Sequence, residues 1–264
     1  MSEPILIERT GAVATLTLNR PESLNTLDFA MMEALVEQTA ALAADTALRV
    51  VIVKGAGKHF MAGGDLRSFA IRLEHAPDVR RAEFQTMIER LHAAIETLHR
   101  MPAIAIAQVR GAVAGFGLSL LCACDLAVAA DDAYFTTAYR HIALTPDGGG
   151  TWALPRIVGL RKAMEMLLLS DRFDAQDALR LGLVNRVVPV AELEAATAAI
   201  ARSVATGPRM ALANVKRLAR ESLDRSLSEQ LQAEAISFAR CAATSDFAEG
   251  IRAFLDKRPA RFDP

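Results

Sequence analysis

The strongest constraint on the fold of this chain is a repeated pattern in which an apolar run ends at a turn and a helical segment follows. Such runs lie at residues 49–55, 103–109 and 125–130. Their short length and apolar, partly β-branched composition predict buried strands. Connections of this kind favour a parallel or mixed sheet with helices outside it. The predicted class is therefore α/β.

The N-terminal part adds a hairpin and two long helices to this pattern. Alternation over residues 5–18 around Thr10-Gly11 predicts two paired strands. Asp28 is a suitable N-cap for a helix of about 15 residues. Charged residues alternate with apolar residues at helical spacing over residues 78–100, which predicts another helix.

The composition changes near Pro189. Residues 190–255 contain no strand-like run and are rich in Ala, Leu, Glu and Arg. Several helices are expected there, with a break at Gly207-Pro208. We therefore divide the chain into a core over residues 1–189 and a helical region over residues 190–264, which is expected to cover a site or to form a subunit interface.

Composition excludes several classes of function. The 264 residues are 52% hydrophobic and 23% charged, with a formal net charge of −1. That balance gives no reason to expect nucleic acid or an anionic membrane as a partner. No run of about 18 apolar residues indicates a membrane span. The N-terminus lacks the regions of a signal peptide, so a cytoplasmic location is expected. Cys122, Cys124 and Cys241 are predicted to be free thiols, not a disulfide framework or a metal site.

Two glycine-rich turns carry the chemistry, FMAGGDL at 60–66 and GAVAGFG at 111–117. Glycine allows tight turns and leaves backbone N–H groups open to a ligand. Two such groups aimed at one oxygen form an oxyanion hole. The segment TPDGGGTW at 145–152 adds the carboxylate of Asp147. These features together predict an enzyme that polarises a carbonyl and moves a proton beside it.

Three acidic residues near these segments have competing interpretations. Asp65 and Asp125 are expected to be structural, Asp65 as the N-cap of the helix after its turn. Asp147 has two open readings. It either caps a helix over residues 148–157, which would lower its pKa, or acts as a base in an apolar pocket, where burial would raise its pKa.

Six segments together resemble the crotonase superfamily, the enoyl-CoA hydratase/isomerase enzymes. They are LNRPESLNTLD (18–28), HFMAGGDL (59–66), the run from Val109 to Phe135, TPDGGGTWALPRIVG (145–159), SDRFDAQDALRLGLVNRVV (170–188) and AFLDKRPARF (253–262). The resemblance implies a spiral of ββα units with a C-terminal helical region. It also implies an acyl-CoA thioester substrate and assembly as a homotrimer or hexamer. No cofactor or metal is expected, because coenzyme A enters as part of the substrate.

The same resemblance assigns roles to individual residues. The oxyanion-hole N–H groups would belong to Gly64 and Phe116, with Gly115 beside them, and Asp147 would be the catalytic base. Other residues are implied in substrate binding: Leu24, Ala62, Asp65, Leu66 and Tyr139 near the turns, and Phe254 and Lys257 from a C-terminal FxxK pattern.

The departures from the family pattern favour one reaction. Hydratases of the family use two glutamates, and the matching positions here hold Ser119 and Tyr139. Hydration therefore looks disfavoured, because placing and deprotonating a water usually needs two carboxylates. Moving a double bond needs one base, so an enoyl-CoA isomerase is predicted. Tyr139 could donate a hydrogen bond or fill space, and space-filling is favoured; none of the five histidines has metal-ligand spacing.

Other readings stay open. One is a hydratase-like enzyme or an isomerase of aromatic acyl-CoA, since TPDGGGTWALPR resembles members of phenylacetate degradation. Another is a dehalogenase-like or thioester-cleaving enzyme with Asp147 as nucleophile. The third is an acyl-CoA-binding pseudoenzyme or scaffold. Some members of the superfamily bind RNA, but this sequence has no basic patch that would support RNA binding.

Overall fold

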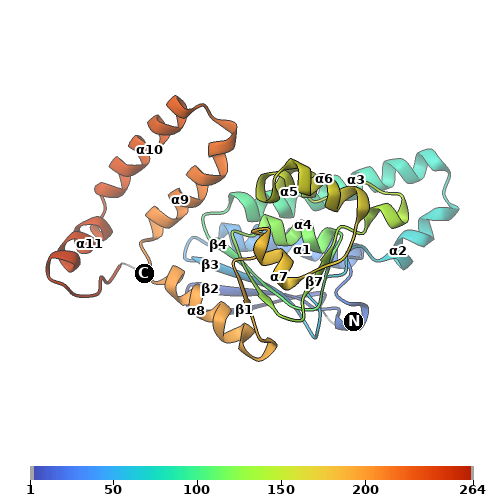
Figure 1. Ribbon diagram of the computed structural model, residues 1–264, viewed down its shortest axis with the longest axis horizontal. Coiled ribbons are helices and arrows are strands. Elements are labelled where there is room, and N and C mark those ends of the chain that lie inside the picture. Colours follow the sequence, from blue (N-terminus) through green and yellow to red (C-terminus); the bar gives the residue numbers. More distant parts are fainter. Residues whose placement is uncertain (1–2, 263–264) are drawn as a thin grey trace.

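The fold is built on a mixed sheet of six strands, and the computed structural model describes residues 3–262 (Figure 1). The sheet order is β1-β2-β3-β4-β6-β9. Its strands are β1 (Ile5–Thr10), β2 (Val13–Leu18), β3 (Val50–Gly55), β4 (Ile104–Val109), β6 (Leu126–Ala130) and β9 (Arg186–Val188). A smaller sheet has the order β5-β7-β8, with β5 (Ala112–Ala114), β7 (Tyr134–Thr136) and β8 (Phe173–Asp174).

Strand pairing follows the predicted pattern. β1 and β2 form an antiparallel hairpin whose turn places Gly11 at φ +60°, while β2, β3, β4, β6 and β9 pair in parallel. The first four residues of β3 are fully or almost fully buried, as expected for a strand covered on both faces. The predicted hairpin and the three predicted buried strands are confirmed.

Helices cover both faces of the large sheet. The helices of the chain are α1 (Phe29–Ala44), α2 (Leu66–Ala70), α3 (Pro77–Arg100), α4 (Phe116–Ala123), α5 (Gly150–Val158), α6 (Leu160–Leu169), α7 (Ala175–Arg180), α8 (Leu193–Ala205), α9 (Arg209–Glu221), α10 (Leu227–Ala242) and α11 (Ser245–Leu255). Asp28 caps α1 by accepting a hydrogen bond from the Met31 N–H over 2.8 Å. The predicted cap at Asp28 and the break at Gly207-Pro208, between α8 and α9, are confirmed.

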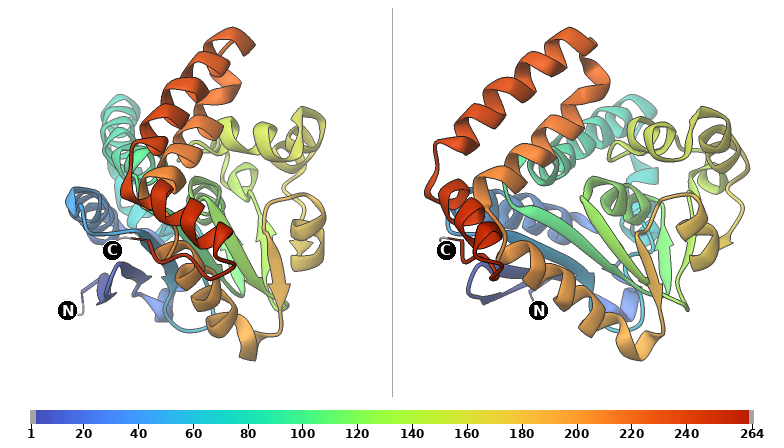
Figure 2. Two further views of the ribbon diagram at one scale, coloured as in Figure 1. Left: turned by 90° about the vertical axis from the view of Figure 1, so that its left-hand side faces the viewer. Right: turned by 60° about the vertical axis from the view of Figure 1, so that its left-hand side comes forward.

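The core has two parts on opposite faces of the sheet. On one face, Leu16 and Val53 pack with Met31 of α1, Leu91 of α3 and Leu120 of α4. Every residue of α4 is buried, so this helix is fixed on all sides. On the other face α8 lies across the strands, as Figure 2 shows, and buries Ala201 and Leu193 against them.

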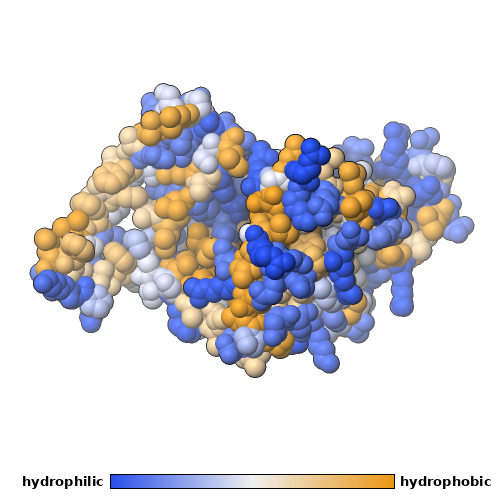
Figure 3. Space-filling model, viewed as in Figure 1, coloured by the Kyte–Doolittle hydropathy of each residue, from blue (hydrophilic) through white to orange (hydrophobic). Residues whose placement is uncertain are grey.

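Helices α9, α10 and α11 form an arm that extends from the body of the molecule (Figures 1 and 2). The predicted all-helical C-terminal region is confirmed, and the division at residue 190 stays a prediction. Large apolar side chains are exposed along the arm, and Figure 3 shows them gathered there. They include Leu227, Leu231, Phe238, Phe247 and Phe254.

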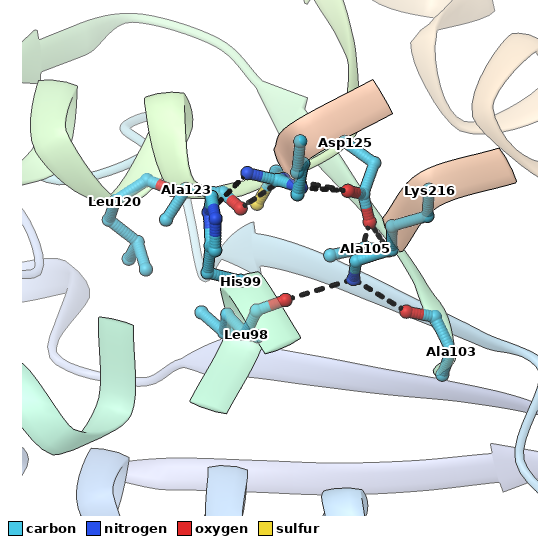
Figure 4. Close-up of polar contacts among 10 residues, drawn as sticks. Leu98, His99, Ala103, Ala105, Leu120, Ala123, Asp125 and Lys216 are labelled. Carbon is cyan, nitrogen blue, oxygen red and sulfur yellow. Dashed lines mark hydrogen bonds and ion pairs between the residues drawn. The ribbon is translucent and has the colours of Figure 1, made fainter. Parts of the chain in front are cut away.

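A buried ion cluster fixes the base of the arm to the body (Figure 4). The Asp125 carboxylate contacts Lys216 Nζ over 2.9 Å and Arg220 over 2.6 Å. Lys216 also donates to the carbonyls of Leu98 and Ala103, at 3.0 and 2.9 Å. Asp125 is therefore structural, as predicted, because it neutralises two cations that join α9 to the sheet.

Within residues 3–262, no helix is long and apolar enough to cross a membrane. The same part of the chain holds no group of three or more His, Cys, Asp or Glu side chains that is suited to a metal ion. Cys122 and Cys124 are buried free thiols, and burial raises the pKa of each to about 12.

Candidate functional site

The two glycine-rich turns meet side by side. Met61 and Val113 form a parallel bridge, and the Ala114 N–H donates to the Met61 carbonyl over 2.9 Å. Gly63 and Gly115 have φ values of +88° and +52°. A Cβ built on Gly115 would lie 3.4 Å from the Gly63 Cα, so small residues are needed for this close approach.

The contact between the turns brings two unused backbone donors to one cavity. Neither the Gly64 N–H nor the Phe116 N–H forms a hydrogen bond within the described residues 3–262. Phe116 is the first residue of α4, where an N–H has no acceptor inside the helix. Gly115 carries the unusual backbone angle, so phenylalanine at 116 is tolerated.

The cavity between these turns and α3 has a volume of about 430 Å³. Its wall is largely apolar and includes Leu27, Met32, Leu66, Phe69, Phe84, Met87, Ile88, Phe116, Ile142 and Leu144. A concave, largely apolar space with a few polar groups is typical of a small-molecule site.

Asp147 lies in the wall of this cavity and is held by Tyr139. The Tyr139 hydroxyl donates to Asp147 Oδ1 over 2.5 Å. Burial raises the pKa of Asp147, and the hydrogen bond from Tyr139 opposes that rise. Burial and the neighbouring carboxylate also raise the pKa of Tyr139, so its hydroxyl stays protonated. The expectation that Tyr139 only fills space is wrong, because its hydroxyl is a hydrogen-bond donor in the cavity.

The reading of Asp147 as a helix cap is also wrong. The helix α5 begins at Gly150, not at 148, and its N-cap is Gly149 at φ +77° with no side-chain cap. Two successive glycines with positive φ separate Asp147 from the helix and turn its side chain to Tyr139. The carboxylate is therefore free of helix N–H groups.

Two further side chains reach the backbone next to Asp147. Ser119 Oγ donates to the Asp147 carbonyl over 2.8 Å, and His92 Nε2 accepts from the Gly148 N–H over 3.2 Å. His92 also lines the cavity. Sequence reasoning missed His92, because its position on α3 lies more than 50 residues from Asp147 and follows no motif.

Asp147 differs from the other acidic residue of the wall. Asp28 caps α1 and pairs with Arg20 over 3.1 Å. Among the described residues that line the cavity, Asp147 is the one carboxylate with neither a helix cap nor an ion pair.

The remaining predicted binding residues are divided between the cavity and other places. Ala62, Leu66 and Gly115 line the cavity. Asp65 caps α2 through the Arg67 N–H and pairs with Arg20, so its predicted structural role is confirmed.

Besides Asp65, three predicted substrate-binding residues lie outside the lining of this cavity. Leu24 is 40% exposed, and its carbonyl accepts the Ala62 N–H over 3.1 Å. Phe254 is 82% exposed at the end of α11, and Lys257 follows it with φ +53°. The latter two belong to the arm, so within one chain they do not reach the cavity.

A larger cavity of about 800 Å³ lies between α3, α5 and α9. It borders the ion cluster at Lys216 and Arg220, whose charges already pair with Asp125. The chemically competent groups described above lie in the smaller cavity.

Comparison with known proteins gives consistent results. Residues 8–264 match the family model described as enoyl-CoA hydratase/isomerase. A probable enoyl-CoA hydratase of Rhodobacter capsulatus is 37% identical over 98% of this chain and 97% of its own length. The 1,2-epoxyphenylacetyl-CoA isomerase of Escherichia coli is 34% identical over 99% of both chains.

Solved structures agree with these sequence matches. The crystal structure of an enoyl-CoA hydratase from Polaromonas sp. JS666 has a TM-score of 0.91 at 36% identity, over 98% of this chain and 99% of the other. That of a putative enoyl-CoA hydratase/isomerase from Mycobacterium abscessus has a TM-score of 0.93 at 31% identity, with the same coverage. The predicted crotonase-like fold is confirmed.

Proposed function

Because the chain belongs to the enoyl-CoA hydratase/isomerase family, we propose that it is an acyl-CoA isomerase that shifts a double bond with Asp147 as its proton shuttle. The observation that carries this proposal is the single unpaired carboxylate in the wall of the cavity, held by Tyr139. Hydratase and isomerase names both occur among the relatives, so the choice between them rests on the site.

The side chains around Asp147 favour isomerisation over hydration. The family resemblance puts the two hydratase glutamates at Ser119 and Tyr139, and here both are hydroxyls. Each hydroxyl donates a hydrogen bond to Asp147, Ser119 to its carbonyl and Tyr139 to its carboxylate. One carboxylate remains for proton transfer, which suffices when the same group removes and returns the proton.

The proposed reaction uses one base and one oxyanion site. The Asp147 carboxylate removes a proton from C2 of a 3-enoyl thioester, and the electron pair moves to the thioester oxygen as a dienolate. The N–H groups of Gly64 and Phe116 stabilise that oxygen. Asp147 then returns the proton to C4, which leaves the double bond between C2 and C3. The raised pKa of Asp147 suits both transfers, and no resident cofactor takes part.

The test is conjugation of 3-hexenoyl-CoA, followed by ultraviolet absorbance of the 2-enoyl product. We expect turnover by the wild type and a loss of at least about 100-fold in kcat for Asp147→Asn. Binding of hexanoyl-CoA, measured by calorimetry, should change little. Turnover unaffected by Asp147→Asn would exclude this base. No turnover by the wild type would exclude isomerisation of aliphatic 3-enoyl-CoA substrates.

Two other activities would be identified by separate measurements on the same protein. A covalent aryl or acyl adduct on Asp147, detected by mass spectrometry, would identify a nucleophile instead of a base. Tight acyl-CoA binding without deuterium exchange at C2 would identify a binding protein. A cytoplasmic location and a trimer or hexamer remain predictions of the family resemblance.

An aromatic acyl group is a second candidate substrate. Phe69 and Phe84 line the cavity and pack edge to face with ring centroids 5.1 Å apart, and Phe116 lies in the same wall. Similarity to the 1,2-epoxyphenylacetyl-CoA isomerase supports the same class. We expect phenylacetyl-CoA to bind more tightly than hexanoyl-CoA, and the reverse order would favour an aliphatic substrate.

A further inference from the structure

The peptide bond between Asp147 and Gly148 is held on both of its polar atoms by side chains. Its carbonyl oxygen accepts from Ser119 Oγ over 2.8 Å. Its N–H donates to His92 Nε2 over 3.2 Å. The two side chains come from different helices, Ser119 from the buried α4 and His92 from α3.

We call the two hydrogen bonds from Ser119 and to His92 the clamp, because together they hold the peptide plane. In a trans peptide the C=O and N–H point in opposite directions. The hydrogen bonds from Ser119 and His92 therefore hold the plane from opposite sides and oppose its rotation. Rotation is otherwise easy here, because Gly148 and Gly149 have φ values of +58° and +77° and glycine adopts many backbone angles.

We propose that Ser119 and His92 are positioning residues that fix the Asp147–Gly148 peptide and so aim the Asp147 carboxylate into the cavity. This inference rests on the proposed role of Asp147. It gives a function to Ser119 at the position where the resemblance would place a glutamate. It also explains a histidine in the cavity wall without assigning it a proton-transfer step.

The contact with Gly148 limits which side chains can replace His92. The Gly148 N–H donates to His92 Nε2, so this contact needs a hydrogen-bond acceptor at that position. Glutamine offers Oε1 as an acceptor at a similar reach, while leucine keeps bulk and offers none. His92→Gln and His92→Leu thus separate the hydrogen bond from the packing.

The packing around the clamp is tight, which provides an alternative explanation to be tested. A Cβ on Gly148 would lie 2.8 Å from the Phe116 ring and 2.9 Å from Ser119 Cβ. If His92 and Ser119 serve packing alone, their loss should lower the melting temperature and leave kcat unchanged in the folded protein.

The experiment measures kcat and KM with 3-hexenoyl-CoA for the wild type, His92→Leu, His92→Gln and Ser119→Ala. The loss of one hydrogen bond predicts a kcat roughly 2- to 10-fold lower in His92→Leu and in Ser119→Ala, with KM changed much less. His92→Gln should recover much of the loss. His75→Leu is the matched control, since the His75 side chain pairs with Glu83 and lies outside the cavity lining.

A second measurement does not depend on the reaction. Hydrogen–deuterium exchange, read by mass spectrometry on a peptide containing Gly148, should be faster in His92→Leu than in His92→Gln or the wild type. Equal exchange and equal kcat in the two His92 variants would overturn the clamp. An inactive wild type with the expected exchange difference would overturn the proposed reaction and leave the clamp standing.

Discussion

The Tyr139 hydroxyl donates to Asp147 Oδ1 over 2.5 Å in the wall of the apolar cavity. This contact joins a short 3-10 helix, Tyr139–Ile142, to the loop before α5. Burial raises the pKa of Asp147, and Tyr139 moderates the rise because its hydrogen bond favours the ionised form. The pair therefore sets how readily the carboxylate takes and returns a proton.

Removal of this hydroxyl should change the pH dependence of turnover. In Tyr139→Phe the Asp147 carboxylate loses a donor that favours its charged form, so its pKa rises further. The base must be ionised to start the reaction, so the acidic limb of the kcat/KM profile should move to higher pH. A profile with 3-hexenoyl-CoA measures this, and a limb that stays in place or moves to lower pH would contradict it.

The burial of Asp147 should also affect how the free energy of unfolding depends on pH. Its pKa is raised in the folded state, so the unfolded state releases the proton first as pH rises. The free energy of unfolding therefore loses a contribution between the unfolded and folded pKa values. Asp147→Asn should be more stable than the wild type at pH 7, and the difference should shrink as pH falls towards about 4, where the carboxyl is protonated in the folded state and half-protonated in the unfolded state. Urea unfolding at both values tests the sign, and a less stable variant at pH 7 would refute it.

Gly115→Ala should lower kcat by more than its loss of folding stability can explain. Gly115 has φ +52° and precedes the Phe116 N–H, so a relaxed backbone there would move one oxyanion donor. Gly182→Ala is the matched control, because Gly182 has φ +76° and open space around it, far from the cavity lining. Both substitutions place a Cβ in a sparsely populated backbone region and should each cost about 1–3 kcal/mol of stability.

The two glycine variants are distinguished by kinetics. We expect a kcat about 10-fold or more lower in Gly115→Ala, since removal of an oxyanion donor costs more than that in other enzymes. Gly182→Ala should keep kcat near that of the wild type. Similar kcat values in the two variants would argue against a role of the Phe116 N–H.

The ion cluster at the base of the arm should be a large contributor to stability. Asp125→Asn leaves Lys216 and Arg220 buried without a counter-charge, and we expect a loss of about 3–5 kcal/mol in the free energy of unfolding. Arg217→Gln removes an exposed ion pair with Glu221 on the same helix and should change stability by less than about 0.5 kcal/mol. Chemical unfolding at one fixed protein concentration compares them, and equal losses would show that burial of the cluster is unimportant.

Much of the architecture follows from local patterns in the sequence. Asp28 and Asp65 precede helical segments, and both side chains cap those helices. The apolar run that became β3 is buried, as its composition predicts. Such features depend on neighbours a few residues apart, so composition and spacing suffice to predict them.

The sequence by itself determined the hairpin, the three buried strands, the long helices, the two glycine turns and the presence of a carboxylate at 147. Only the tertiary structure decided what that carboxylate does, because its partners come from distant segments. Asp147 could have capped a helix, but two glycines delay α5 and direct its side chain to Tyr139. His92 lies in the site for a similar reason, since the packing of α3 against α1 and α4 brings its side chain to the Gly148 N–H. Hydrogen bonds between segments far apart in the chain leave no periodic signal, and the folded backbone alone brings their atoms together.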